Sequence, residues 1–121
     1  MNVFLLAVAS IIMSVAAQFS LKAGMTEIRS GLPSVEPVGL HSLLPFVTNR
    51  FLILGFVLYG LGAIVWLAVL AKWDVSKAYP LVGLGFLLSA MVGFAVGEPV
   101  TLFRAFGVLL IVAGVFIVAM S

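Results

Sequence analysis

A stripe of polar residues runs along the first apolar segment of the chain. Its members stand four residues apart, at Ser10, Ser14, Gln18 and Lys22. Four residues advance an α-helix by about 400°, so successive members shift by only about 40° and share one slowly winding face. The serines can either bond neighbouring helices or line a polar path. Lys22, one turn beyond Gln18, is well placed to hold an anionic phosphate as a point charge.

Aromatic and charged residues in the later segments supply further candidates. Tyr59 and Trp66 stand seven residues apart on one helix face, where they can line a cavity wall, serve ordinary packing or belong to an interfacial aromatic belt. Glu98 is the acidic residue at the edge of a span, and it is the candidate for a proton or cation site. It can equally be an acidic residue ahead of an early-helix proline, which is a structural role. Tyr79 and Arg104 are the remaining candidates for substrate contact.

No arrangement of residues typical of an enzyme is present in the sequence. Cysteine is absent and histidine occurs once, which excludes disulfides, thiolate zinc sites and multi-histidine metal sites. The sequence also lacks a paired carboxylate, a nucleophile with its base and a phosphate-binding glycine loop. We therefore expect no catalytic residue, no metal and no cofactor.

Composition places these candidates in a membrane. Of the 121 residues, 64% are hydrophobic and 8% are charged, whereas soluble domains are about 45–50% apolar and about 25% charged. A chain this short could not hide so much apolar surface in its own core, so a soluble monomer is excluded. The net charge of +2 is also too small for the basic face of a nucleic-acid-binding protein.

Four apolar runs are long enough to cross a bilayer, which takes about 20 helical residues. We predict helices at about 3–22, 51–71, 78–97 and 100–120, with a long loop at 23–49. The charged residues lie between these runs or at their ends, as the cost of a charge at the bilayer centre requires. The short connections make helices two, three and four antiparallel neighbours. The predicted fold is all-α, a four-transmembrane-helix bundle in a single membrane domain over residues 1–121.

Three stretches of the sequence resemble a known group of transporters. They are residues 14–22 (SVAAQFSLK), 75–81 (VSKAYPL) and 97–101 (GEPVT), the last leading into 107–114 (GVLLIVAG). Together with four short helices, they resemble the small multidrug resistance proteins of the drug/metabolite transporter (EamA-like) superfamily. Within it, the chain is most similar to the flippase subunits for 4-amino-4-deoxy-L-arabinose linked to undecaprenyl phosphate, which carry similar S-V-A-x-Q, A-Y-P and E-P-V-S elements.

One departure from the drug-exporting branch changes what the resemblance implies. Those members carry a membrane-embedded Glu in helix one, eight residues before the Lys that matches Lys22, and Ser14 stands there instead. Without that carboxylate, a carrier of an anionic lipid-linked substrate suits the chain better than a proton-coupled small multidrug or cation exporter.

The resemblance thus implies a dimeric protein of the bacterial inner membrane, paired with itself or with a similar subunit. It would move a polyprenyl-phosphate-linked sugar, or the lipid phosphate, between leaflets, with no nucleic-acid partner. Lys22 would hold the phosphate, helped by Gln18 and Arg104. The polar path would be lined by Ser10, Ser14, Tyr59, Trp66 and Tyr79. The alternatives are a cation exporter dependent on Glu98 and a non-transporting membrane subunit.

Overall fold

The computed structural model describes residues 2–31 and 40–121, and these residues form helices and their connections, with no strand among them. The elements are α1 (Val3–Gly31), α2 (Leu40–Thr48), α3 (Arg50–Leu70), α4 (Val75–Ala78), the 3-10 helix η1 (Tyr79–Val82), α5 (Gly83–Ala95) and α6 (Leu102–Met120). Four helical stretches are long and apolar enough to span a membrane: Val3–Ser30, Arg50–Leu70, Val75–Ala95 and Leu102–Met120. The predicted all-α fold with four spans is confirmed.

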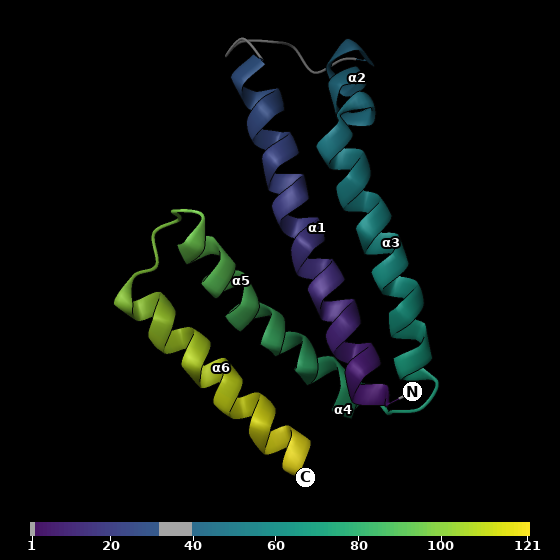
Figure 1. The fold of residues 1–121 in the computed structure, drawn as a ribbon, viewed down its shortest axis with the longest axis vertical. Helices are drawn as coiled ribbons and strands as arrows, with labels where there is room; N and C mark the ends of the chain where they lie inside the picture. The colour runs from purple at the N-terminus through teal and green to yellow at the C-terminus, as the bar shows by residue number, and fades with distance from the viewer. Residues whose placement is uncertain (1, 32–39) are drawn as a thin grey trace.

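The helices form two antiparallel pairs (Figure 1). In the first pair, α1 packs along α3 over most of its length. In the second pair, α6 packs on α5 and η1, and α5 in turn contacts α1. The start of α5 lies close to the first turns of α1, and the α5–α6 pair then leans away from α1 toward its other end (Figure 1). The space between the two pairs therefore widens along α1.

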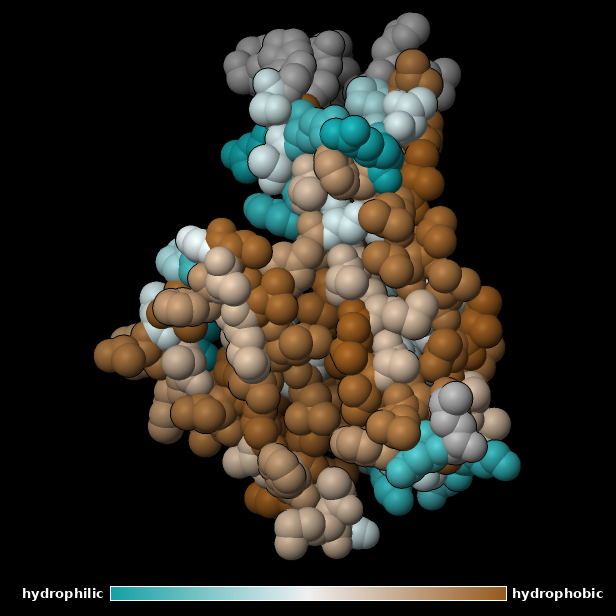
Figure 2. Space-filling model, in the orientation of Figure 1, coloured by the Kyte–Doolittle hydropathy of each residue, from teal (hydrophilic) through white to brown (hydrophobic). Residues whose placement is uncertain are grey.

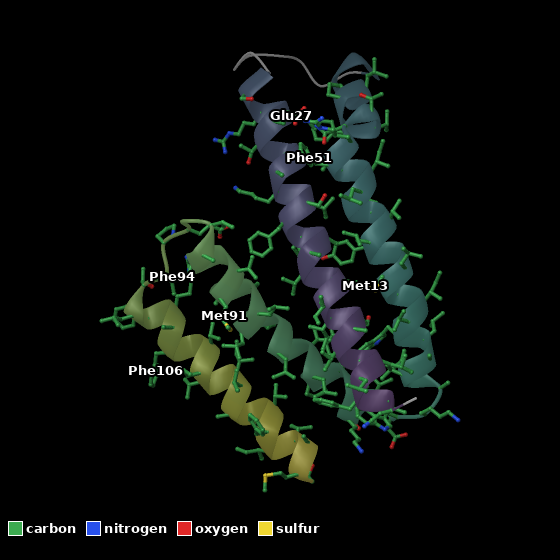
Figure 3. The ribbon with its side chains drawn as sticks, in the orientation of Figure 1. Met13, Glu27, Phe51, Met91, Phe94 and Phe106 are labelled. Atoms are coloured by element: carbon green, nitrogen blue, oxygen red, sulfur yellow. The ribbon has the colours of Figure 1, made fainter. Side chains whose placement is uncertain are left out.

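Small residues bring α1 and α3 into close contact. A Cβ placed on Gly55 would lie 2.6 Å from Leu21 Cδ2 and 3.2 Å from the backbone oxygen of Ala17. Met13 lies between the two helices (Figure 3), and a Cβ on Gly62 would lie 3.5 Å from its Cβ. Backbones can approach this closely only where side chains are small, as is usual between helices in membranes.

The two pairs meet in a small apolar core. Gly83 of α5 lies directly beneath α6, because a Cβ there would be 2.8 Å from Val115 Cγ2. Gly85, two residues on, faces α1, where its Cβ would be 3.3 Å from Ile11 Cγ2. The buried residues of this core are Ala7, Ile11, Val15, Val69, Ala78, Leu81 and Val115. The core fixes one end of the α5–α6 pair against α1 and leaves its other end free to diverge.

The first helix is longer than predicted. It was expected to end at residue 22 but continues to Gly31, and helix α2 occupies part of the expected loop 23–49; residues 32–39 of that loop lie outside the described residues. The prediction equated the end of the apolar run with the end of the helix. The next proline after residue 22 is Pro33, so polar residues up to Gly31 continue the helix without losing a backbone bond. At about 1.5 Å per residue, the 29 residues of α1 span about 43 Å, and the hydrocarbon core is about 30 Å thick.

The third span is broken where a continuous helix over 78–97 was predicted. It consists of α4, the 3-10 turn η1 and α5, with Pro80 in the first turn of η1. Proline lacks an N–H and restricts the residue before it, so the chain tightens at this point instead of continuing as one α-helix. The span also ends earlier than predicted, at Ala95, because Gly97 adopts a φ of +95° and the Glu98 N–H bonds back to the Gly93 carbonyl at 2.8 Å.

The other two spans, α3 and α6, begin within one or two residues of the predicted positions, and side-chain caps explain where each one starts. Helix α3 begins at Arg50 because the Asn49 side chain accepts hydrogen bonds from the backbone N–H groups of Phe51 and Leu52. Helix α6 begins at Leu102 because Thr101 Oγ1 accepts the Arg104 N–H at 3.1 Å.

The surface is hydrophobic across the body of the molecule, and hydrophilic residues gather near its ends (Figure 2). Large apolar side chains stand exposed on α3 and α6, including Phe56, Ile64, Phe106 and Phe116. Figure 3 shows Phe106 on the side of α6 that faces away from α5. Contiguous apolar surface of this kind is a liability in water but suits lipid tails. The chain is therefore a multi-pass membrane protein.

Candidate functional site

The two helix pairs enclose a cleft of about 840 Å³ between α1, α3, α5 and the first half of α6. Its walls are mostly apolar, but every polar candidate on the first helix faces it. Its polar and charged lining residues are Ser10, Ser14, Gln18, Lys22, Tyr59, Trp66, Ser89, Glu98 and Arg104. The long axis of the cleft thus follows the stripe predicted from the spacing on α1.

The serines of the stripe belong to the contact between α1 and α3. Ser10 is buried and donates its hydroxyl proton to the Gly62 carbonyl at 2.7 Å. Ser14 is half-buried, and a Cβ on Gly62 would lie 3.7 Å from its Oγ. The sequence left open whether the serines bond a neighbouring helix or line a polar path. Ser10 does bond a neighbouring helix, and both serines also line the cleft.

Further along the stripe, Gln18 connects α1 to the aromatic residues of α3. Its Nε2 donates to the hydroxyl of Tyr59. Tyr59 and Trp66 are both half-buried and line the same wall, as their spacing on one helix face predicts. An amide, a phenol hydroxyl and an indole therefore stand together in this wall, where each can offer a hydrogen-bond donor to a ligand oxygen.

Lys22 stands one turn beyond Gln18 and also lines the cleft. Its side chain is exposed, and no carboxylate of the described residues lies within ion-pair distance of its ammonium group. An ammonium group of this kind is a compact point charge with three donors. It is available to an anionic ligand that enters the cleft.

Arg104 and Glu98 reach the cleft from the α5–α6 connection. Arg104 Nη1 donates to the Pro99 carbonyl at 2.7 Å, which folds the guanidinium back over the turn. The Glu98 side chain lies over Gly93, where a Cβ would be 3.3 Å from Oε1. Among the described residues, Glu98 and Arg104 form no ion pair with each other, although they are only six positions apart. The cleft therefore holds two cationic groups and one carboxylate.

Tyr79 is the predicted site residue that the structure places elsewhere. It lies in η1, at the opposite end of α5 from Glu98, with 66% of its surface exposed, and it does not line the cleft. The sequence reasoning did not name any of the α5 residues that line the cleft, among them Ser89 and Gly93. Their four-residue repeat on one face was the available signal.

Helices α3 and α6 both line the cleft and make no extensive contact with each other. Helices α1 and α5, which also line it, pack together. A ligand with a charged head and an apolar tail could keep the head among the polar residues and the tail outside.

Four membrane-spanning helices around a cleft with charged lining residues define a small multi-pass membrane protein. Comparison with curated proteins shows which proteins of this kind are similar to the chain in sequence. A protein of Pseudomonas savastanoi pv. phaseolicola, described as a probable 4-amino-4-deoxy-L-arabinose-phosphoundecaprenol flippase subunit ArnE, is 41% identical over 75 residues, which are 61% of this chain and 66% of that protein. The ArnE subunit of Pseudomonas syringae pv. syringae is 39% identical over 59% of this chain and 67% of its own length.

The second subunit type is also matched. The ArnF subunit of Erwinia tasmaniensis is 37% identical over 69% of this chain and 65% of its own length. The chain belongs to the family of these flippase subunits. It spans just under two thirds of the length of the first relative. No family model and no solved structure matches it. The resemblance predicted from the sequence is confirmed.

Proposed function

We propose that the protein is a subunit of a flippase of the bacterial inner membrane that moves a polyprenyl-phosphate-linked sugar between leaflets. The observation that carries this proposal is the gathering of Lys22, Gln18 and Arg104 in one membrane-embedded cleft. The family supports it, because the relatives are named for a sugar carried on phosphoundecaprenol.

The phosphate is the part of such a substrate that the cleft suits best. A phosphate in a site lined mainly by apolar groups needs charged or strongly polar donors to replace its lost water. Lys22 supplies the charge, and Gln18 and Tyr59 supply donors one turn away. Arg104 approaches from α6, so the phosphate would be held between two helix pairs rather than on one helix.

The sugar and the lipid tail would occupy different parts of the structure. At about 840 Å³, the cleft falls within the usual range of about 300–1,000 Å³ for small-molecule sites, which suits a sugar phosphate. The polyprenyl chain would stay in the membrane, between α3 and α6. Only the head, which is costly to move through lipid, would then have to cross inside the protein.

A second subunit completes the proposed assembly. The relatives of both types are named as subunits, and α3 and α6 of this chain make no extensive contact with each other. A homodimer or a pair with a similar chain would place a second set of helices against α3 and α6. Both arrangements fit the exposed apolar faces of these two helices.

The test is transport of a fluorescent polyprenyl phosphate sugar in proteoliposomes, with dithionite reporting the leaflet. Lys22→Ala should reduce lipid-phosphate binding and transport by tenfold or more, since it removes the ammonium group proposed to hold the phosphate. Lys72→Ala is the matched control, because this exposed lysine follows α3 and does not line the cleft. Circular dichroism and gel filtration establish that both variants fold. Wild-type binding in Lys22→Ala would refute the assignment, and export of ethidium-like cations instead would favour the cation exporter.

A further inference from the structure

Glu98 occupies a position in the cleft that the backbone holds in place. Gly97 takes a left-handed φ of +95°, and the Glu98 N–H bonds to the Gly93 carbonyl at 2.8 Å. The side chain then lies over Gly93, where the absence of a Cβ leaves room for the carboxyl group. One glycine of α5, Gly93, and one of the connection, Gly97, thus help to place this carboxylate at the cleft.

This carboxylate has no partner within the described residues. Its nearest cation along the chain, Arg104, directs Nη1 to the Pro99 carbonyl. No ion pair or hydrogen bond of the described residues involves the Glu98 side chain. A structural role for Glu98 at the start of α6 does not explain its place in the cleft, because Thr101 already caps that helix.

A carboxylate is also unexpected in a site for a simple anion, because it would repel a phosphate. The cleft contains Lys22 and Arg104 on the cationic side and Glu98 on the anionic side. A sugar phosphodiester that also bears a protonated amine has both signs of charge. The relatives are named for such a substrate, a 4-amino sugar on phosphoundecaprenol.

We propose that Glu98 binds the ammonium group of an amino-sugar head and makes the cleft select amine-bearing lipid-linked sugars over neutral ones. This inference rests on the proposed flippase function. The phosphate contacts Lys22 and the Gln18 amide, and the amine reaches the α5–α6 connection. A neutral sugar leaves Glu98 without a partner next to a bound phosphate, which weakens its binding.

The selectivity is modest, because Glu98 is exposed and solvent screens part of the interaction. A hydrogen bond to a charged group at such a site corresponds to a preference of about tenfold. Selection of this kind raises the affinity for one head group without changing how the phosphate is held. It should therefore be separable from the role of Lys22.

The experiment compares one polyprenyl phosphate amino sugar with its N-acetylated, uncharged form. Binding to the detergent-solubilised protein is followed by the fluorescence of Trp66, which lines the cleft, in a Trp73→Phe background. The unmodified site should bind the amine about tenfold more tightly. Glu98→Gln should remove this preference and leave the affinity for the acetylated lipid unchanged or higher. Glu27→Gln, an exposed carboxylate outside the cleft, should keep the preference.

The outcomes separate this inference from the function on which it rests. Equal binding of the two lipids by the unmodified site, or a preference that survives Glu98→Gln, overturns the role of Glu98. If Lys22→Ala still weakens both lipids in that case, the flippase proposal stands. If the unmodified protein binds neither lipid, both proposals fall.

Discussion

The close contact of α1 with α3 predicts that two glycines on the same helix will respond in opposite ways to alanine. A Cβ on Gly55 would lie 2.6 Å from Leu21 Cδ2 and 3.2 Å from the Ala17 backbone oxygen, whereas ordinary contacts are 3.4–4 Å. Leu21 can rotate away, but the backbone oxygen can move only if the helices separate. A Cβ on Gly60 would meet nothing within 4 Å. A comparison of Gly55→Ala with Gly60→Ala therefore isolates the effect of steric crowding between α1 and α3.

Two opposing contributions set how far each substitution should change the free energy of unfolding. Replacing a helix-interior glycine by alanine favours the helix by about 0.8–1 kcal/mol, and this term applies to both positions. Overpacking a tight contact costs about 1–3 kcal/mol, and this term applies to Gly55 alone. Gly60→Ala should stabilise the protein by up to about 1 kcal/mol. Gly55→Ala should be less stable than that control by about 1–3 kcal/mol.

The assay is unfolding of the purified protein in mixed micelles by titration with SDS, followed by circular dichroism. The two variants share a helix and a substitution, so differences in expression or detergent do not enter the comparison. If Gly55→Ala proved as stable as Gly60→Ala, the reasoning that small residues set the α1–α3 distance would be wrong. The width of the cleft, which rests on that distance, would then need another explanation.

Two further predictions concern hydrogen bonds across the same pair of helices. Ser10→Ala removes a buried bond to a backbone carbonyl of α3 and should destabilise the protein by about 0.5–1.5 kcal/mol in the same titration; no loss would mean that the bond contributes nothing in lipid. Tyr59→Phe removes the hydroxyl bonded to Gln18 and should weaken lipid-phosphate binding several-fold, whereas Tyr79→Phe, outside the cleft, should not. Equal effects at the two tyrosines would contradict the placement of the site.

Much of the lining of the cleft could be predicted because it depends on the period of a single helix. The stripe that ends at Lys22 shares a face in any α-helix, and the structure turns that face into the cleft. The seven-residue spacing of Tyr59 and Trp66 likewise predicts a shared helix face, and both residues line the cleft. Tyr79 could not be placed by such reasoning. Its position depends on the 3-10 turn at Pro80, which separates it from the helix that lines the cleft.

The sequence by itself determined that the chain crosses a membrane four times, since apolar runs and the placement of charges decide this locally. It also determined which face of α1 is polar and which family the chain resembles. The tertiary structure decided how far α1 continues beyond the apolar run, because caps and prolines rather than hydropathy end a helix. It also decided that Glu98 and Arg104 meet Lys22 in one cleft without pairing with each other. That juxtaposition depends on the angle at which the α5–α6 pair leaves α1, and this angle is set by packing between residues distant in sequence.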